Sequence, residues 1–144
     1  MDHRPDLLAI LEASTRPYLQ QAAARLPRTV RIRLAAGGRD GLTSLGHVLP
    51  SRLILVDDAV PDLSGFALLR EIRQERRTIC TPVVLLIHSR DAGASRDAYG
   101  AGANSVIVMP QFEDDLLQLF TNVLLYWCTI NRVPRWPENA DVSG

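Results

Sequence analysis

The chain has 144 residues with 16 basic and 16 acidic side chains, and it contains no lysine, so every fixed cation is an arginine. This length fits one domain with its own core, and the balanced charge gives no electrostatic reason to expect nucleic acid or an anionic membrane as a partner. The N-terminus is too polar for a signal peptide and no apolar run reaches membrane-spanning length, so we expect a soluble cytoplasmic protein.

Apolar segments of two kinds alternate along the sequence. Short runs rich in Val, Ile and Leu predict buried parallel strands at Leu7–Leu11, Val30–Leu34, Leu53–Val56, Pro82–Ile87 and Ser105–Val108. Amphipathic stretches between them predict helices at Pro17–Leu26, Arg39–Val48, Ser64–Arg76, Ala92–Ala101 and Glu113–Asn131. Such an alternation predicts an α/β fold, a doubly wound (βα)5 parallel sheet with helices on both faces.

The first strand has an alternative reading. Leu7–Leu11 could equally begin a helix that runs to Leu26. The interruption at Ser14–Pro17 and the need of the sheet for a central strand favour the strand. We predict one domain over residues 1–132 and a loosely ordered tail over residues 133–144, where proline and polar residues prevail.

Residues near the segment ends add detail. Ser14 or Thr15 can cap the first helix, and Ser64 can cap the third. Cys80 and Cys128 fall within apolar segments, far from each other and outside any metal-binding spacing, so we expect two reduced thiols in the core.

Asp57 directly follows the apolar run Leu53–Val56 and precedes a series of turn residues. In open α/β sheets, sites gather beyond the carboxyl ends of the strands. A carboxylate at that point is therefore placed for chemistry rather than for packing, as a nucleophile, a metal ligand or a helix cap.

Several residues around Asp57 together carry a family resemblance. Asp57 is followed by Pro61 and Gly65, and further along come Pro82–Leu86, the turn Gly102–Ser105 and Pro110. With this pattern the chain resembles the receiver domain of two-component response regulators over about residues 7–131. Its ending, Tyr126–Asn131, resembles stand-alone regulators that partner bacteriophytochrome-type histidine kinases.

The resemblance implies a flavodoxin-like receiver fold and a signalling protein rather than an enzyme. That family receives a phosphoryl group from a kinase histidine on an aspartate, with Mg²⁺. The phosphoacceptor then corresponds to Asp57 and the first metal-site acid to Glu12. The second acid corresponds to Ala13, the switch hydroxyl to Ile87 and the lysine to Met109.

These replacements weaken the implied site in three separate ways. Without an acid at Ala13, only Glu12 and Asp57 are left as carboxylate ligands, so a Mg²⁺ site should be weak or absent. Met109 cannot pair with a phosphoryl oxygen, and Ile87 has no hydroxyl to bond the product. Because phosphoryl transfer depends on positioning and charge stabilisation, each loss acts on catalysis itself.

Two further residues could lie in the Asp57 pocket. Asp58 is expected to be a turn or capping carboxylate, and it could act as a substitute acid if the strand end turns it inward. His88 follows Ile87, and a lone histidine in that place is more often a hydrogen-bonded bystander. If His88 reaches Asp57, it could partly replace the missing positive charge.

The last helix is apolar over most of its circumference, which exceeds what one buried stripe needs. We therefore expect a second buried face and a homodimer, with tyrosine and tryptophan as anchors. The expected interface residues are Leu119, Val123, Leu124, Tyr126, Trp127 and Ile130. The alternative is that the segment around Val133 and Trp136 folds back over the helix.

Two functions stay open at this point. One is an atypical phosphorelay receiver with Asp57 as phosphoacceptor, acting through protein–protein contacts with a histidine kinase. The other is a pseudo-receiver that binds a signalling partner without phosphotransfer. A haloacid-dehalogenase-like phosphatase would need an aspartate where Ala59 stands, and Ser14–Thr15 alone is thin support for a flavin phosphate loop.

Overall fold

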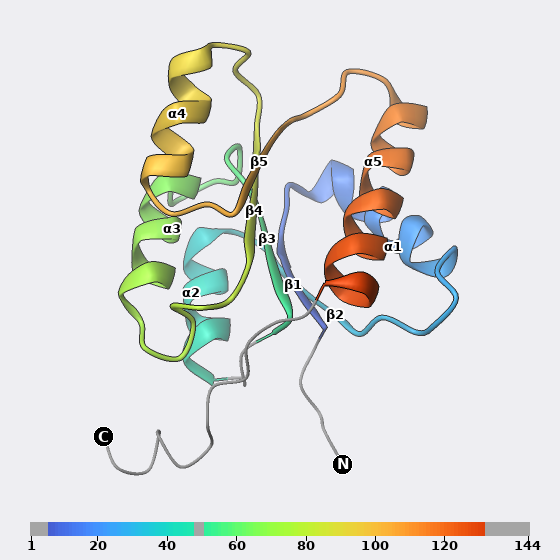
Figure 1. The fold of residues 1–144 in the computed structure, drawn as a ribbon, viewed down its shortest axis with the longest axis horizontal. Helices are drawn as coiled ribbons and strands as arrows, with labels where there is room; N and C mark the ends of the chain where they lie inside the picture. The colour runs from blue at the N-terminus through green and yellow to red at the C-terminus, as the bar shows by residue number, and fades with distance from the viewer. Residues whose placement is uncertain (1–5, 48–50, 132–144) are drawn as a thin grey trace.

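The structure is a computed structural model that describes residues 6–47 and 51–131 (Figure 1). Its strands are β1 (Leu7–Ile10), β2 (Ile32–Ala35), β3 (Leu53–Asp57), β4 (Val83–Ile87) and β5 (Ser105–Val108). Its helices are η1 (Ala13–Thr15, 3-10), α1 (Arg16–Ala24), α2 (Gly38–His47), α3 (Gly65–Gln74), α4 (Ala92–Gly100), α5 (Glu113–Leu125) and the π-helical turn η2 (Tyr126–Ile130). The predicted tail and the predicted domain end at residue 132 lie outside this part of the chain.

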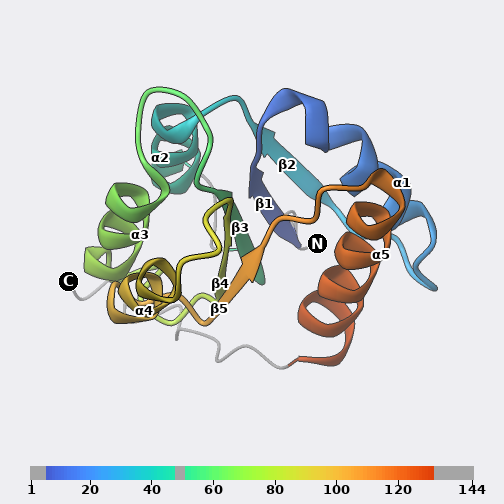
Figure 2. The same cartoon turned by 90° about the horizontal axis from the view of Figure 1, so that it is seen from above.

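The strands form one parallel sheet in the order β2-β1-β3-β4-β5. Helices α1 and α5 cover one face of the sheet, and α2, α3 and α4 cover the other (Figure 2). The predicted doubly wound α/β fold is confirmed, and Leu7–Ile10 is a strand rather than the start of a helix. Because β2 and β3 lie on opposite sides of β1, the strand order reverses between β1 and β3, where ligands bind in such sheets.

The pleat of each strand divides the core into two layers. In β3, Leu53 and Leu55 pack into the layer under α1 and α5, whose largest buried side chain is Phe120. Ile54 and Val56 point the opposite way, into the layer under α2, α3 and α4. Since both faces are covered, β3 and β4 are buried along their whole length, which explains their unbroken runs of Val, Ile and Leu.

Side-chain caps agree with the sequence only in part. Ser64 caps α3 as predicted, because its Oγ accepts the Ala67 N–H at 3.1 Å. Thr15 precedes α1 but makes no capping bond; its hydroxyl instead donates to the Glu12 carbonyl at 2.8 Å, inside the 3-10 turn. The prediction of a side-chain cap at Thr15 is therefore wrong. Asp91, not anticipated, caps α4 through the Gly93 N–H.

The predicted last helix changes character before its end. α5 stops at Leu125 and continues as the π-helical turn, which closes with the Asn131 N–H donating to the Tyr126 carbonyl. Within this turn the Cys128 carbonyl accepts hydrogen bonds from Arg28 and Arg52. These contacts fix the end of the last helix to the loop before β2 and to the start of β3.

A buried carboxylate organises the same corner. Asp6 is only 5% exposed and accepts the Arg31 N–H at 2.9 Å. Guanidinium groups of Arg28 and Arg52 approach its Oδ1 at 3.3 and 3.7 Å. This cluster lies before β1, at the end of the sheet where the parallel strands begin, and Asp57 lies at the opposite end.

The two cysteines differ in their surroundings. Cys128 is fully buried as predicted, and burial, followed by the nearby Asp6 carboxylate, raises the pKa of its thiol to about 12. Cys80 is exposed, because it lies in the turn before β4 rather than in an apolar element. Its assignment to the core was wrong. None of the helices in residues 6–47 and 51–131 is long and apolar enough to cross a membrane.

Candidate functional site

Asp57 is the last residue of β3, at the edge where the parallel strands end. Its backbone pairs with Leu86 of β4, and Ile87 of β4 in turn pairs with Val108 of β5. By the pleat, Asp57 points to the same face as Leu55, toward the layer under α1 and α5. The predicted position at the carboxyl edge of the sheet is where the structure places it.

The carboxylate of Asp57 is fully buried, and only one of its two oxygens is hydrogen-bonded. Its Oδ1 accepts the Ala59 N–H at 2.8 Å and lies 3.0 Å from His88 Nε2. Its Oδ2 has no hydrogen-bond partner among the residues that the structure describes. An ionised carboxylate can only accept, so Nε2 is the donor in the pair with His88. The two donors hold Oδ1 and leave the lone pairs of Oδ2 available.

Strand register explains why His88 reaches Asp57. Leu86 is opposite Asp57, and its side chain lies in the same layer as Leu55. Since side chains alternate, His88, two residues later, points to that face as well. The sequence favoured a bystander role for His88, and the structure instead places its imidazole on the Asp57 carboxylate, with 48% of the side chain exposed.

The same alternation corrects the expectation for Ile87. Its side chain is 1% exposed and packs in the layer under α2, α3 and α4, on the other face from Asp57. Ile87 therefore does not line the pocket beside the carboxylate. Met109 does share the face of Asp57, where it is 8% exposed in the layer under α1 and α5.

The two other acids near this edge do not join Asp57. Glu12 follows β1 and is exposed, and no hydrogen bond links its side chain to Asp57. Asp58 lies on the face of α3, since a Cβ added to Gly65 would be 3.4 Å from Asp58 Oδ1. Its backbone N–H donates to Leu86. Asp58 is thus neither a cap nor a substitute acid for Asp57.

The backbone contacts of Asp57 were not predicted from the sequence. The bond from Ala59 N–H to Oδ1 forms an Asx turn, in which an aspartate side chain bonds the backbone two residues on. The run of Asp57, Asp58 and Ala59 before a turn carries that signal. Beyond it, Asp62 adopts a positive φ of 72° and accepts the Gly38 N–H, which joins the β3–α3 loop to the start of α2.

The donor set does not fit a resident metal ion. Among the described residues, no group of three or more His, Cys, Asp or Glu side chains is arranged to hold one. Asp57 Oδ2 is a suitable oxygen, but it would need Glu12, which is exposed and unconnected to it. Mg²⁺ prefers octahedral oxygen donors and takes one or two carboxylates together with phosphate and water. A weak site formed by Glu12 and Asp57 stays a prediction.

Comparison with known proteins identifies the family. No protein-family model matches the chain. The chain is 31% identical over 122 residues to the probable methanogenesis regulatory protein FilR2 of Methanothrix harundinacea, covering 81% of this chain and 78% of that protein. It is 25% identical to the two-component response regulator ORR11 of Oryza sativa subsp. indica, covering 83% and 81%. The chain belongs to the response regulator family. It is a two-component receiver domain.

Solved structures agree with this receiver fold. The phosphorylated cyanobacterial phytochrome response regulator RcpA superposes with a TM-score of 0.83 and covers 91% of the chain at 19% identity. The Mn²⁺-bound form of response regulator Rcp1 gives 0.81 over the same share, also at 19% identity. The chain spans only 40% of the response regulator Rre1 of Synechocystis, so some relatives are considerably longer.

Some of the predicted interface residues near the end of the last helix are exposed, and others are buried. Tyr126 is 48% and Ile130 is 61% exposed, one helical turn apart. Trp127 is half-buried and meets the Tyr126 ring edge-on, with ring centres 5.1 Å apart. Val123 and Leu124 are 6% and 0% exposed. These two residues fill the domain's own core, which corrects their assignment to an interface.

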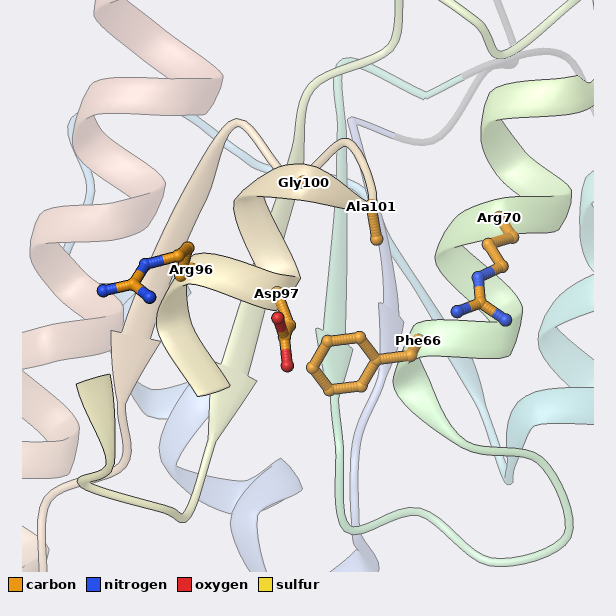
Figure 3. Close-up of a pocket in the computed structure, with 6 residues that line it drawn as sticks. All are labelled: Phe66, Arg70, Arg96, Asp97, Gly100 and Ala101. Atoms are coloured by element: carbon orange, nitrogen blue, oxygen red, sulfur yellow. The ribbon is translucent and has the colours of Figure 1, made fainter. Parts of the chain in front are cut away.

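A hollow of about 560 Å³ lies between α3 and α4 of the receiver. Figure 3 shows Phe66 and Arg70 projecting from α3, and Arg96 and Asp97 from α4, with the Phe66 ring directed toward Asp97. Its lining comes from helices and includes no residue of the strand ends. This hollow is therefore separate from the Asp57 site.

Proposed function

We propose that this receiver accepts a phosphoryl group on Asp57 Oδ2 from a histidine kinase. The observation that carries the proposal is the one-sided bonding of the buried carboxylate, with two donors on Oδ1 and none on Oδ2. A buried acceptor without a partner costs stability, and such costs concentrate at functional sites.

The proposed step is an in-line displacement. Oδ2 attacks phosphorus, the new O–P bond forms, and the P–N bond to the kinase histidine breaks. The kinase imidazole departs with the bonding electron pair and takes up a proton. Oδ1 becomes the carbonyl oxygen of the acyl phosphate, still facing the Ala59 N–H.

The partner proposals have separate support. RcpA is described as a phytochrome response regulator, and a second neighbour, RPA3017, as acting in red light signalling of R. palustris, with a TM-score of 0.74 at 20% identity. We therefore propose a bacteriophytochrome as the first kinase to test. We further propose a homodimer through the exposed Tyr126 and Ile130 of the last helix, with the partly buried Leu119 and Trp127 beside them.

A phosphorylation assay tests the acceptor. Purified protein is incubated with Mg²⁺ and acetyl phosphate, and its intact mass is measured before and after. The wild type should gain one phosphoryl group, and Asp57→Asn should gain none while keeping the same far-UV circular dichroism. Asp58→Asn serves as a matched control, since it removes the neighbouring carboxylate, which lies on the face of α3 and does not contact Asp57.

One observation favours the second function. The Asp57 side chain is 0% exposed, so a phosphodonor can reach it only if the cover of the site moves. If the wild type gains no phosphoryl group from acetyl phosphate or from a kinase, Asp57 is not an acceptor. The receiver would then act as a phosphorylation-independent binding module.

A further inference from the structure

Phosphoryl transfer needs a group that stabilises negative charge, and in this chain that group cannot be a lysine. The sequence contains no lysine, and Met109 occupies the buried position that shares a face with Asp57. Arg16 lies at the same edge of the sheet, but its guanidinium donates to the Leu11 and Ala36 carbonyls, where β1 and β2 end. Among the described residues, His88 is the side chain that bonds the Asp57 carboxylate.

We propose that His88 is a catalytic residue for phosphorylation of Asp57, in the role that a lysine would otherwise fill. The inference rests on the proposed function. His88 Nε2–H holds Oδ1 at 3.0 Å during the attack by Oδ2 and continues to bond that oxygen as it becomes the acyl phosphate carbonyl. As a donor already in place, this N–H stabilises the negative charge that gathers at the site during transfer.

The geometry favours this role over simple satisfaction of a buried group. Oδ1 already accepts the Ala59 N–H, so it does not need His88 for a partner. If the histidine only compensated burial, it would be expected to donate to Oδ2, which is the oxygen that lacks a donor. Two donors on one oxygen instead fix the carboxylate plane and leave the second oxygen open as the nucleophile.

The exposure of His88 supports a catalytic position as well. Its side chain is 48% exposed whereas Asp57 is 0% exposed, so the imidazole extends from the buried carboxylate to the protein surface. A phosphodonor arriving from solvent would therefore meet this imidazole before the buried carboxylate. Arg90, two residues on, is exposed and has no hydrogen bond or ion pair within the described part of the chain, which makes it a matched control for loss of a nearby cation.

The test compares initial rates of phosphorylation by acetyl phosphate in the wild type, His88→Ala, His88→Lys and Arg90→Ala. Loss of His88 should slow the reaction on the order of 100–1,000-fold, the size of losing one preorganised donor. His88→Lys should recover most of the rate, and Arg90→Ala should match the wild type. Thermal unfolding of each variant shows whether a rate change reflects folding.

A second readout examines the pair directly. In ¹⁵N spectra of histidine side chains, Asp57→Asn should shift the His88 Nε2 resonance, and Arg90→Ala should not. Wild-type rates in His88→Ala, or a His88→Lys variant as slow as His88→Ala, would overturn the catalytic role while the acceptor stands. Absence of any phosphorylation in the wild type would overturn the acceptor and, with it, this inference.

Discussion

Cys128 and Cys80 show how the surroundings of a residue set its reactivity. The Cys128 thiol has a pKa raised from 9.0 to about 12, chiefly by burial, and Cys80 is exposed in a turn. Only a thiolate reacts readily with alkylating agents. At pH 8, iodoacetamide should therefore modify one cysteine in the native protein and two in denaturant, as counted by mass spectrometry.

The matched variant identifies the reacting residue. Cys80→Ser should show no labelling in the native state and one label after denaturation. Equal rates for both cysteines of the native wild type would show that Cys128 is not buried in solution.

At the scale of single residues, the sequence leads to Asp57 but not to its partner. The apolar run before Asp57 identifies the strand end, and position alone then indicates a site. Whether Ile87 or His88 faces the carboxylate depends on the register between β3 and β4, because a shift of one residue exchanges the two faces. That register cannot be derived from the sequence alone. Burial of Asp57 likewise depends on segments that converge only in the folded chain.

At the scale of elements, one arginine joins three segments. The Arg73 guanidinium, on α3, donates to Asn104 Oδ1 and to the carbonyls of Thr78, Ile79, Thr81 and Gly102. Asn104 Oδ1 also accepts the Val83 N–H, so the network fixes the starts of β4 and β5. Burial lowers the pKa of Arg73, yet the guanidinium stays charged.

Arg73→Lys should destabilise this network despite the retained charge. An ammonium group cannot present the planar fork of donors, so several partly buried carbonyls would lose their partner. We expect the free energy of unfolding to fall by about 2 kcal/mol in urea titrations. Arg70→Lys on the exposed side of the same helix is the control and should unfold like the wild type. Equal midpoints for the two variants would show that the Arg73 bonds contribute little.

Helices and strands could be predicted where the spacing of apolar residues alone determines them. All strands and helices occur near their predicted positions, because apolar runs and amphipathic stretches need no tertiary information. The exceptions depend on tertiary contacts. The π-helical turn at Tyr126–Ile130 forms where Arg28 and Arg52 take the Cys128 carbonyl, and those arginines come from distant segments.

At the scale of the whole molecule, the two ends of the sheet have separate tasks. The end of the sheet at Asp57 carries the proposed phosphoacceptor, and the opposite end carries the Asp6 cluster with Arg28 and Arg52. Because that cluster holds the Cys128 carbonyl, it fixes the direction in which Tyr126 and Ile130 face outward. These hydrogen bonds thus connect the proposed dimer surface to the core.

Ile130→Glu tests that surface. Ile130 is 61% exposed, so the substitution should leave the fold intact, but in a twofold dimer it places a charge in the interface twice. We expect the wild type to sediment as a dimer and Ile130→Glu as a monomer, with association weakened by at least about 2 kcal/mol for an anchor residue. Phe112→Glu is the matched control, since Phe112 is 71% exposed at the other end of α5 and should stay dimeric. A monomeric wild type, or a Phe112→Glu variant that dissociates equally, would contradict an interface at the end of this helix.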